Sequence, residues 1–98
     1  MARSQRNRQI DLTNQHNDAC LRTQLETVEG RTCLFNIIAQ CGVYGFTFTG
    51  DNETFIKEGR RSIGCWLISE ICRIDPMAYI KMQIEAAKRE EQFKLRTN

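Results

Sequence analysis

The sequence predicts an all-α protein, a small bundle of about four helices, and three observations support this prediction. Apolar residues recur at helical spacing in four successive stretches of the 98-residue chain. One proline and six glycines leave few helix breakers, and 41% of the residues are hydrophobic, which is enough for one small core. The only strand-like segment, residues 43–48, has no second strand to pair with. We therefore expect a single helical domain over residues 18–98.

Residues 1–17 form a basic arm in this reading. They are rich in Arg, Gln and Asn, and Ile10 and Leu12 are too few apolar residues for the segment to fold alone. The arm carries three arginines against one aspartate, whereas residues 18–98 balance at eleven basic and eleven acidic residues. The arginines are Arg3, Arg6 and Arg8. We expect an extended arm, either disordered or ordered by a neighbouring subunit on which Ile10 and Leu12 are anchors.

The first two expected helices are short. The first begins near Asp18, a good N-cap, ends by Gly30, and carries apolar residues on one face. The second covers about residues 30–40 and ends at Gly42, which suits the left-handed conformation of a C-cap. Their apolar faces comprise Leu21, Leu25 and Val28, then Cys33, Leu34, Ile37, Ile38 and Cys41. An extended connection follows, whose aromatic residues pack on the helices or on a partner; these are Tyr44, Phe46 and Phe48.

The third helix is expected over residues 52–74, with Asp51 as its N-cap. Its expected buried stripe is Ile56, Gly59, Ile63, Leu67, Ile71 and Ile74, flanked by Phe55 and Trp66. Asp75 and Pro76 end this helix and open the fourth, because proline is favoured at the first helical position and disfavours α geometry in the residue before it.

The fourth helix is expected to turn one apolar face inward and then to leave the body. The inner face comprises Met77, Ile80, Ile84 and Ala87. The sequence after Ala87 is nearly all polar, which predicts a projecting C-terminal end, either simply solvated or in contact with another chain. Phe93 and Leu95 are the candidate contacts on this end.

A Glu-Gly-Arg element occurs at residues 29–31 and again at residues 58–60, and each glycine lowers helix stability by roughly 1 kcal/mol relative to alanine. Gly59 lies on the apolar stripe of the third helix, so we expect it to face inward and to permit close helix approach. Arg60 would lie at the border of the stripe and pair with a nearby acid such as Glu53 or with a residue of another helix. Arg61 would point outward, which makes it the leading candidate for a partner contact.

Residues with catalytic or metal-binding chemistry are sparse. The five cysteines include no CxxC pair and no nearby cluster of histidines, so we expect no metal. Four of them, Cys33, Cys41, Cys65 and Cys72, follow the apolar spacing and are expected to be small buried hydrophobes. His16, the sole histidine, lies in the arm beside no plausible nucleophile. No phosphate-binding glycine loop and no membrane-spanning run occurs in the sequence. We therefore expect no enzyme, no cofactor and no membrane association.

Several segments, in order, resemble a family of small proteins of tailed bacteriophages, typified by one from a Bordetella podophage. They are EGRTCLFNIIAQCGVYGFTF, TGDNETFIKEGRRSIGCWLI and IDPMAYIKM, between Gly30 and Met82. Thr32 stands where the first element of the family often has a second arginine. The resemblance implies a phage origin and a place among genes for head assembly and the connector. It also implies a location in the virion and, before assembly, in the bacterial cytoplasm.

Three functions are expected from these observations. The leading one is a virion structural protein, bound in several copies, in a ring, to the portal, head–tail connector or capsid proteins. The second is a packaging or regulatory protein whose arginines contact nucleic-acid phosphates, and the third is an inhibitor of a host protein. The candidate partner-binding residues are Arg61, Arg60, Arg3, Arg6, Arg8, Ile10, Leu12, Tyr44, Phe46, Phe93 and Leu95.

Overall fold

A computed structural model describes residues 2–45 and 53–97 of the chain. These residues form four α-helices and no strand, which confirms the predicted fold class. The helices are α1 (Ala2–Leu25), α2 (Val28–Gln40), α3 (Glu53–Ile74) and α4 (Pro76–Thr97). Phe46, Phe48 and Asp51, for which contacts or a capping role were expected, lie outside the described residues.

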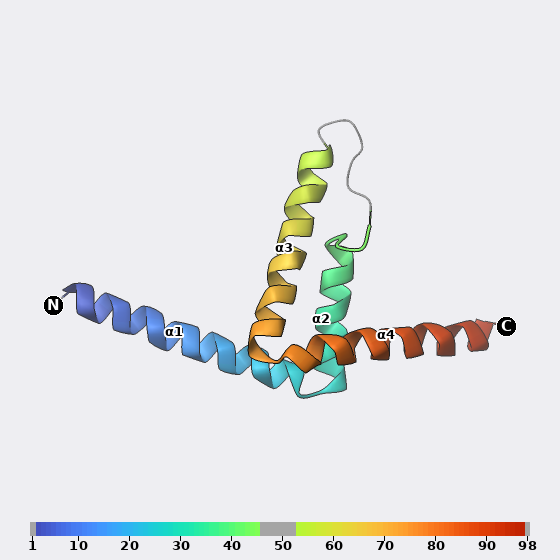
Figure 1. Cartoon of the computed structure of the whole chain (residues 1–98), viewed down its shortest axis with the longest axis horizontal. Helices are drawn as coiled ribbons and strands as arrows, with labels where there is room; N and C mark the ends of the chain where they lie inside the picture. Colours follow the sequence, from blue (N-terminus) through green and yellow to red (C-terminus); the bar gives the residue numbers. More distant parts are fainter. Residues whose placement is uncertain (1, 46–52, 98) are drawn as a thin grey trace.

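The molecule is a flat T (Figure 1). Helices α2 and α3 lie side by side as an antiparallel hairpin, while α1 and α4 project from the base of the hairpin in opposite directions. The extents are 65 × 39 × 17 Å and the radius of gyration is 17.4 Å, against about 13 Å for a compact domain of this length. Much of each helix is therefore left uncovered by the rest of the chain.

Helix α1 begins at Ala2, so the expectation of an extended arm over residues 1–17 and of a helix start near Asp18 was wrong. Residues 2–25 contain no glycine or proline, and most are good helix formers such as Gln, Arg and Leu. The hydroxyl of Thr13 also donates to the carbonyl of Gln9, one turn earlier. The helix was missed because its first half has no apolar face, and apolar periodicity reveals only helices that have one.

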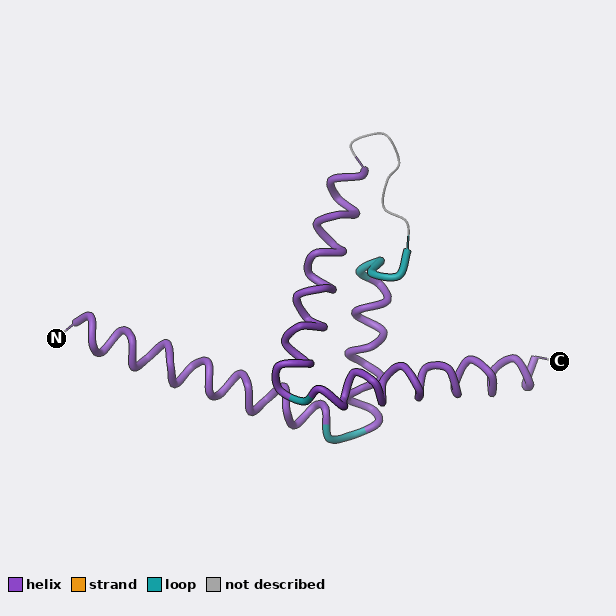
Figure 2. Tube along the Cα trace, in the orientation of Figure 1, coloured by secondary structure: helices purple, strands orange, loops and turns teal. Residues whose placement is uncertain are grey.

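The remaining helix ends follow local capping chemistry (Figure 2). Thr27 is the N-cap of α2 and accepts the amide hydrogen bond of Gly30 at 3.0 Å, so α2 begins two residues earlier than expected. Gly42 follows the end of α2 with φ of 75°, as predicted. The carboxylate of Asp75 accepts the amide of Met77 at 3.1 Å, which confirms the predicted junction between α3 and α4.

The core is small and lies at the base of the T, where the four helices meet. Its buried residues are Leu25 from α1, Ile38 from α2, Ile71 from α3, and Ala78 and Met82 from α4. Partly buried side chains surround it, among them Leu21, Leu34, Leu67, Ile68 and Tyr79.

The inner face predicted for α4 was wrong. Ala78 and Met82 are buried, whereas Met77, Ile80 and Ile84 are 56%, 46% and 51% exposed. Helix α4 carries apolar residues on two opposite faces, and the pattern alone does not say which face the chain covers. Packing selects the face with the small Ala78, because a short side chain lets α4 lie close to the other helices.

The buried stripe predicted for α3 is correct only near the base. Ile71 is fully buried, and Leu67 and Ile74 pack against the core. Ile56 and Ile63, further up the hairpin, are 58% and 60% exposed. The upper half of α3 contacts α2 through another side of the helix, so this part of the stripe faces away from the hairpin.

Candidate interaction surfaces

Two glycines sit where helices approach closely, and neither is Gly59. A Cβ atom added at Gly64 would lie 2.7 Å from the Cβ of Cys41 and still closer to a methyl group of Val43. A Cβ atom at Gly30 would collide with the backbone of Gln24. At Gly59 no atom lies within 4 Å of the added Cβ, so the expected inward-facing role of Gly59 was wrong. Gly64 joins α3 to the end of α2.

Arg31, the arginine of the first Glu-Gly-Arg element, ties three helices together. Its guanidinium donates to both carboxylate oxygens of Glu85 on α4, with the shortest distance 2.8 Å, and to the carbonyl of Leu25 at the end of α1, also at 2.8 Å. The Arg31 side chain is only 11% exposed, and the hydrogen bond with Glu85 raises the pKa of Arg31 above its ordinary value. Arg31 therefore holds α1, α2 and α4 at the base.

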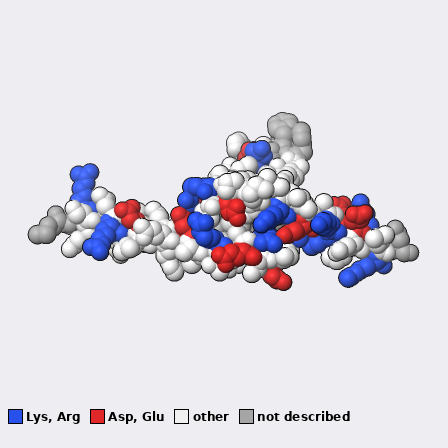
Figure 3. All heavy atoms as spheres, turned by 60° about the horizontal axis from the view of Figure 1, so that its bottom comes forward, with Lys and Arg blue, Asp and Glu red and all other residues white. Residues whose placement is uncertain are grey.

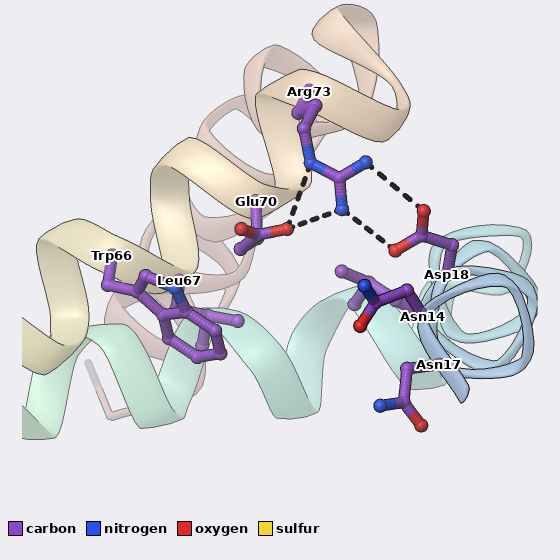
Figure 4. Close-up of a pocket in the computed structure, with 8 residues that line it drawn as sticks. Asn14, Asn17, Asp18, Trp66, Leu67, Glu70 and Arg73 are labelled. Atoms are coloured by element: carbon purple, nitrogen blue, oxygen red, sulfur yellow. Dashed lines mark hydrogen bonds and ion pairs between the residues drawn. The ribbon is translucent and has the colours of Figure 1, made fainter. Parts of the chain in front are cut away.

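Arg73 performs a similar role between α1 and α3 (Figure 4). Its guanidinium donates to Asp18 on α1 at 2.8 and 3.1 Å and to Glu70 at 2.5 and 3.0 Å. The hydrogen bond from Arg73 lowers the pKa of Asp18. Both partners of this pair are well exposed. We call these contacts of Arg73 with Asp18 and Glu70 the Arg73 clamp; they link α1 to α3 where α1 leaves the body.

A pocket of about 560 Å³ lies beside this clamp, and we call it the α1–α3 pocket. Its walls come from both helices: α1 contributes mainly polar residues, and α3 contributes the apolar Trp66 and Leu67 together with the charged Glu70 and Arg73 (Figure 4). The residues are Asn14, Asn17, Asp18, Leu21, Trp66, Leu67, Glu70 and Arg73. Trp66 is 61% exposed, so its ring is available to a molecule that enters the pocket.

Tyr44, predicted as a partner contact, is engaged within the chain. Its hydroxyl is hydrogen-bonded to that of Tyr79 on α4, and its ring stacks on Phe35 at 6.2 Å between centroids. Partial burial, together with the hydrogen bond to Tyr44, raises the pKa of Tyr79 well above its ordinary value. The tyrosine pair thereby anchors the turn after α2 on α4, although Tyr44 remains 56% exposed.

The candidates on the N-terminal arm are all exposed, but they do not share a face. Ile10 and Leu12 are two residues apart in α1, which separates them by about 200° around the helix. They cannot anchor the arm on one neighbour together. Arg3, Arg6 and Arg8 are also spread around the helix, with Arg8 about 140° from Arg3. The arm therefore presents no single basic face.

The C-terminal half of α4 projects from the body as predicted. Phe93 is 55% exposed and lines a groove with Phe35 and Tyr44, and the guanidinium of Arg96 lies 6.0 Å from its ring centroid. Leu95 is 72% exposed. Because Phe93 and Leu95 are two residues apart, they too point in different directions.

Arg60 and Arg61 are both exposed, and neither forms an ion pair with a described residue. Arg60 lies against α2, in a pocket with Cys33 and Ile37. No ion pair joins Arg60 to Glu53, and Arg61, which was expected to point outward, is exposed. Figure 3 shows basic side chains near both projecting ends and mixed charges over the centre of the face it presents, without one broad basic surface.

The cysteines are less buried than expected. Cys33 is exposed, and Cys41, Cys65 and Cys72 are partly exposed; all five thiols are free. His16 contacts the sulfur of Cys20 at 3.6 Å on the exposed surface of α1. Across residues 2–45 and 53–97, no group of three metal-binding side chains occurs. No helix in the same ranges is long and apolar enough to span a membrane.

Two exposed apolar surfaces were not anticipated, although their residues were identified as apolar positions. The first, which we call the α3 stripe, comprises Phe55, Ile56, Gly59, Ile63 and Trp66. The second, which we call the α4 stripe, comprises Met77, Ile80, Ile84, Ala87 and Leu95. The sequence did contain a signal for such surfaces, because it has more apolar positions than a chain of 98 residues can bury.

A comparison with known proteins gives a match to one protein family over most of the body of the molecule. The model of the family described as Bbp19-like phage protein matches residues 21–84. The search of curated proteins and the search of solved structures gave no match. The matched region begins where α1 enters the body and ends at Ile84, so it contains the core, the clamp residue Arg73 and the α3 stripe. The chain belongs to the family of Bbp19-like phage proteins.

Proposed function

We propose that this chain is a non-enzymatic structural or accessory protein of the phage particle, bound in several copies at the portal or head–tail connector. One observation supports this proposal above the others. Among the described residues, fourteen large apolar side chains are exposed, whereas the buried apolar core has five residues. Contiguous exposed apolar patches mark surfaces that bind other proteins, and a partner that binds only the folded state also stabilises it.

The distribution of that apolar surface favours protein partners over a small ligand. The α3 and α4 stripes are long, convex helix surfaces, whereas small-molecule sites are concave and largely enclosed. Helical stripes of this kind dock on other helices or in grooves. The two projecting ends add contact area far from the core, as expected of a subunit that bridges neighbours in an assembly.

Catalysis has no part in this proposal. His16 lies on the exposed arm helix and its described contact is Cys20, not a carboxylate that would orient it. Asp18 and Glu85 are each bound by an arginine of another helix and hold helices together, and Glu70 is bound by Arg73 of its own helix. We further propose that the protein resides in the bacterial cytoplasm before it is incorporated into the virion.

Mass spectrometry of purified phage particles tests the proposal. We expect the chain in mature virions at a fixed ratio to the portal protein, and we expect the portal or a connector protein to be captured with tagged chain from infected cells. An Ile80→Asp variant should lose this capture, because it places a charge in the α4 stripe, whereas Lys81→Asp, beside the stripe, should retain it. Absence of the chain from virions would refute a structural role.

Experiments with the tagged chain also test the two other functions expected from the sequence. Binding to duplex DNA that weakens steeply with added salt, with capture of portal lost, would establish the DNA-contacting function instead. Capture of one host protein at a fixed ratio, without any virion protein, would establish the inhibitor. Either result overturns the proposal.

A further inference from the structure

We propose that the α3 stripe is the interface of a symmetric dimer, in which α3 of one copy packs antiparallel against α3 of a second copy. This inference concerns the partner of one surface and does not depend on where in the particle the chain resides. It rests on the arrangement of large and small side chains along the stripe.

The stripe is continuous, and its side chains are not covered by the part of the chain that the structure describes. Its five residues lie within about 100° of arc on α3, which is the width of one helix-packing face. Phe55 is 78% exposed, and Ile56, Ile63 and Trp66 are each about 60% exposed. Arg60, the cation next to Gly59, lies against α2 and leaves the stripe without charge.

The packing of residues 2–45 and 53–97 gives no reason for a glycine at position 59. Gly59 is exposed in the middle of a long helix, where glycine is roughly 1 kcal/mol less favourable than alanine, and a Cβ atom there would touch nothing. The other helix glycines, Gly30 and Gly64, are both required by close contacts. A close contact from outside the chain would give Gly59 the same role.

The stripe is complementary to itself. Ile56, Gly59, Ile63 and Trp66 follow the alternating spacing of three and four residues at which paired helices interlock. In an antiparallel pair, Gly59 faces the partner's Ile63, and Ile56 faces the partner's Trp66. A large side chain therefore meets a small one at the centre of the interface, as in well-packed cores. A self-complementary patch closes with two copies and does not propagate.

The α1–α3 pocket extends this contact. The antiparallel arrangement brings the beginning of the partner's α3 beside Trp66, which lines the pocket together with Asn14 and Asn17 of α1. Phe and Trp each present about 150–250 Å² of surface, so the exposed parts of Phe55 and Trp66 supply roughly 300 Å² per copy. With the isoleucines, two copies reach about 1,000 Å² in total, which is the lower threshold for a specific interface. The ring expected from the sequence would then be built of dimers.

Sedimentation equilibrium of the full chain tests this inference, with Trp66 fluorescence as a second readout because Trp66 is the only tryptophan. We expect a dimer, with Trp66 emission shifting to shorter wavelength as protein concentration rises. Ile63→Asp should be a folded monomer with the same circular dichroism. Gly59→Leu should weaken the dimer at least tenfold, because it fills the site of the partner's Ile63 while leaving the single chain undisturbed.

Ile80→Asp is the matched control, since it places the same charge on the α4 stripe, at a residue of similar exposure. It should leave the dimer and the Trp66 shift unchanged. A wild-type chain that stays monomeric at the highest soluble concentration would overturn the inference. So would a dimer that survives Ile63→Asp, or one that Ile80→Asp dissociates.

Discussion

The contrast between Gly64 and Gly59 can be measured as two stability changes of opposite sign. In Gly64→Ala the new methyl group would lie 2.7 Å from the Cβ of Cys41, an atom that moves only with its backbone. Overpacking of this kind lowers stability by about 1–3 kcal/mol, and the better helix propensity of alanine returns at most about 1 kcal/mol. We therefore expect a net loss of about 1–2 kcal/mol, or a melting temperature lower by roughly 4–16 °C.

Gly59→Ala provides the control, because the added methyl group meets open space and only the propensity gain of about 0.5–1 kcal/mol remains. Both substitutions should be made in the Ile63→Asp background, so that association does not contribute to stability. Urea unfolding followed by circular dichroism gives the two free-energy changes. If Gly64→Ala is stabilising to the same degree as Gly59→Ala, then α3 and the end of α2 do not approach as described.

Three further predictions concern the polar contacts. Asp18→Asn should remove part of the acid sensitivity of the fold. Because Arg73 lowers the pKa of Asp18, the stability that the Asp18 carboxylate contributes is present above the ordinary pKa of 3.8 and is lost as pH falls through the lower pKa of the folded state. Acid titration of helicity will show the difference. Glu85→Gln should lower the free energy of unfolding by about 1–2 kcal/mol, because its charged partner, Arg31 on α2, is nearly buried. Urea unfolding measures this change. Glu90→Gln, on the exposed surface of α4, is the control and should change the free energy of unfolding little. In alkaline ultraviolet titration, Tyr79, one of the two tyrosines, should ionise well above pH 10 in the folded protein, and Tyr79→Phe should remove that late step. Since the pKa of Tyr79 is raised on folding, its contribution to the free energy of unfolding is complete below pH 10 and declines above it.

The fold class and most helix ends were predictable because they depend on local chemistry. Gly42 and Asp75 act within one turn of their own positions, through backbone conformation and capping. The α3–α4 junction was located to the residue for this reason. Thr27 also acts locally, but it was not identified as a cap, and the start of α2 was placed two residues late. The first half of α1 was the exception, because a helix without an apolar face has no periodic signal.

The faces that pack could not be predicted, because they depend on which helix lies against which. Helices α3 and α4 each have apolar residues on more than one side, and only the three-dimensional arrangement shows that Ile71 and Met82 are inside while Ile63 and Ile80 are outside. The sequence does not show that Gly64 is packed closely whereas Gly59 is exposed. The neighbours of Gly64 come from a turn more than twenty residues away, so no local pattern distinguishes the two positions.

The lengths of the two projecting helix ends set the long dimension of the molecule. The family match stops close to the body, and the part of α1 before residue 21 and the part of α4 after Ile84 lie outside it. A helix lengthens by about 1.5 Å and rotates by about 100° for each added residue. Insertions of whole turns in these ends would change the distance between the contacts they carry while preserving their direction. The span of 65 Å can thus be adjusted without any change to the core at the base.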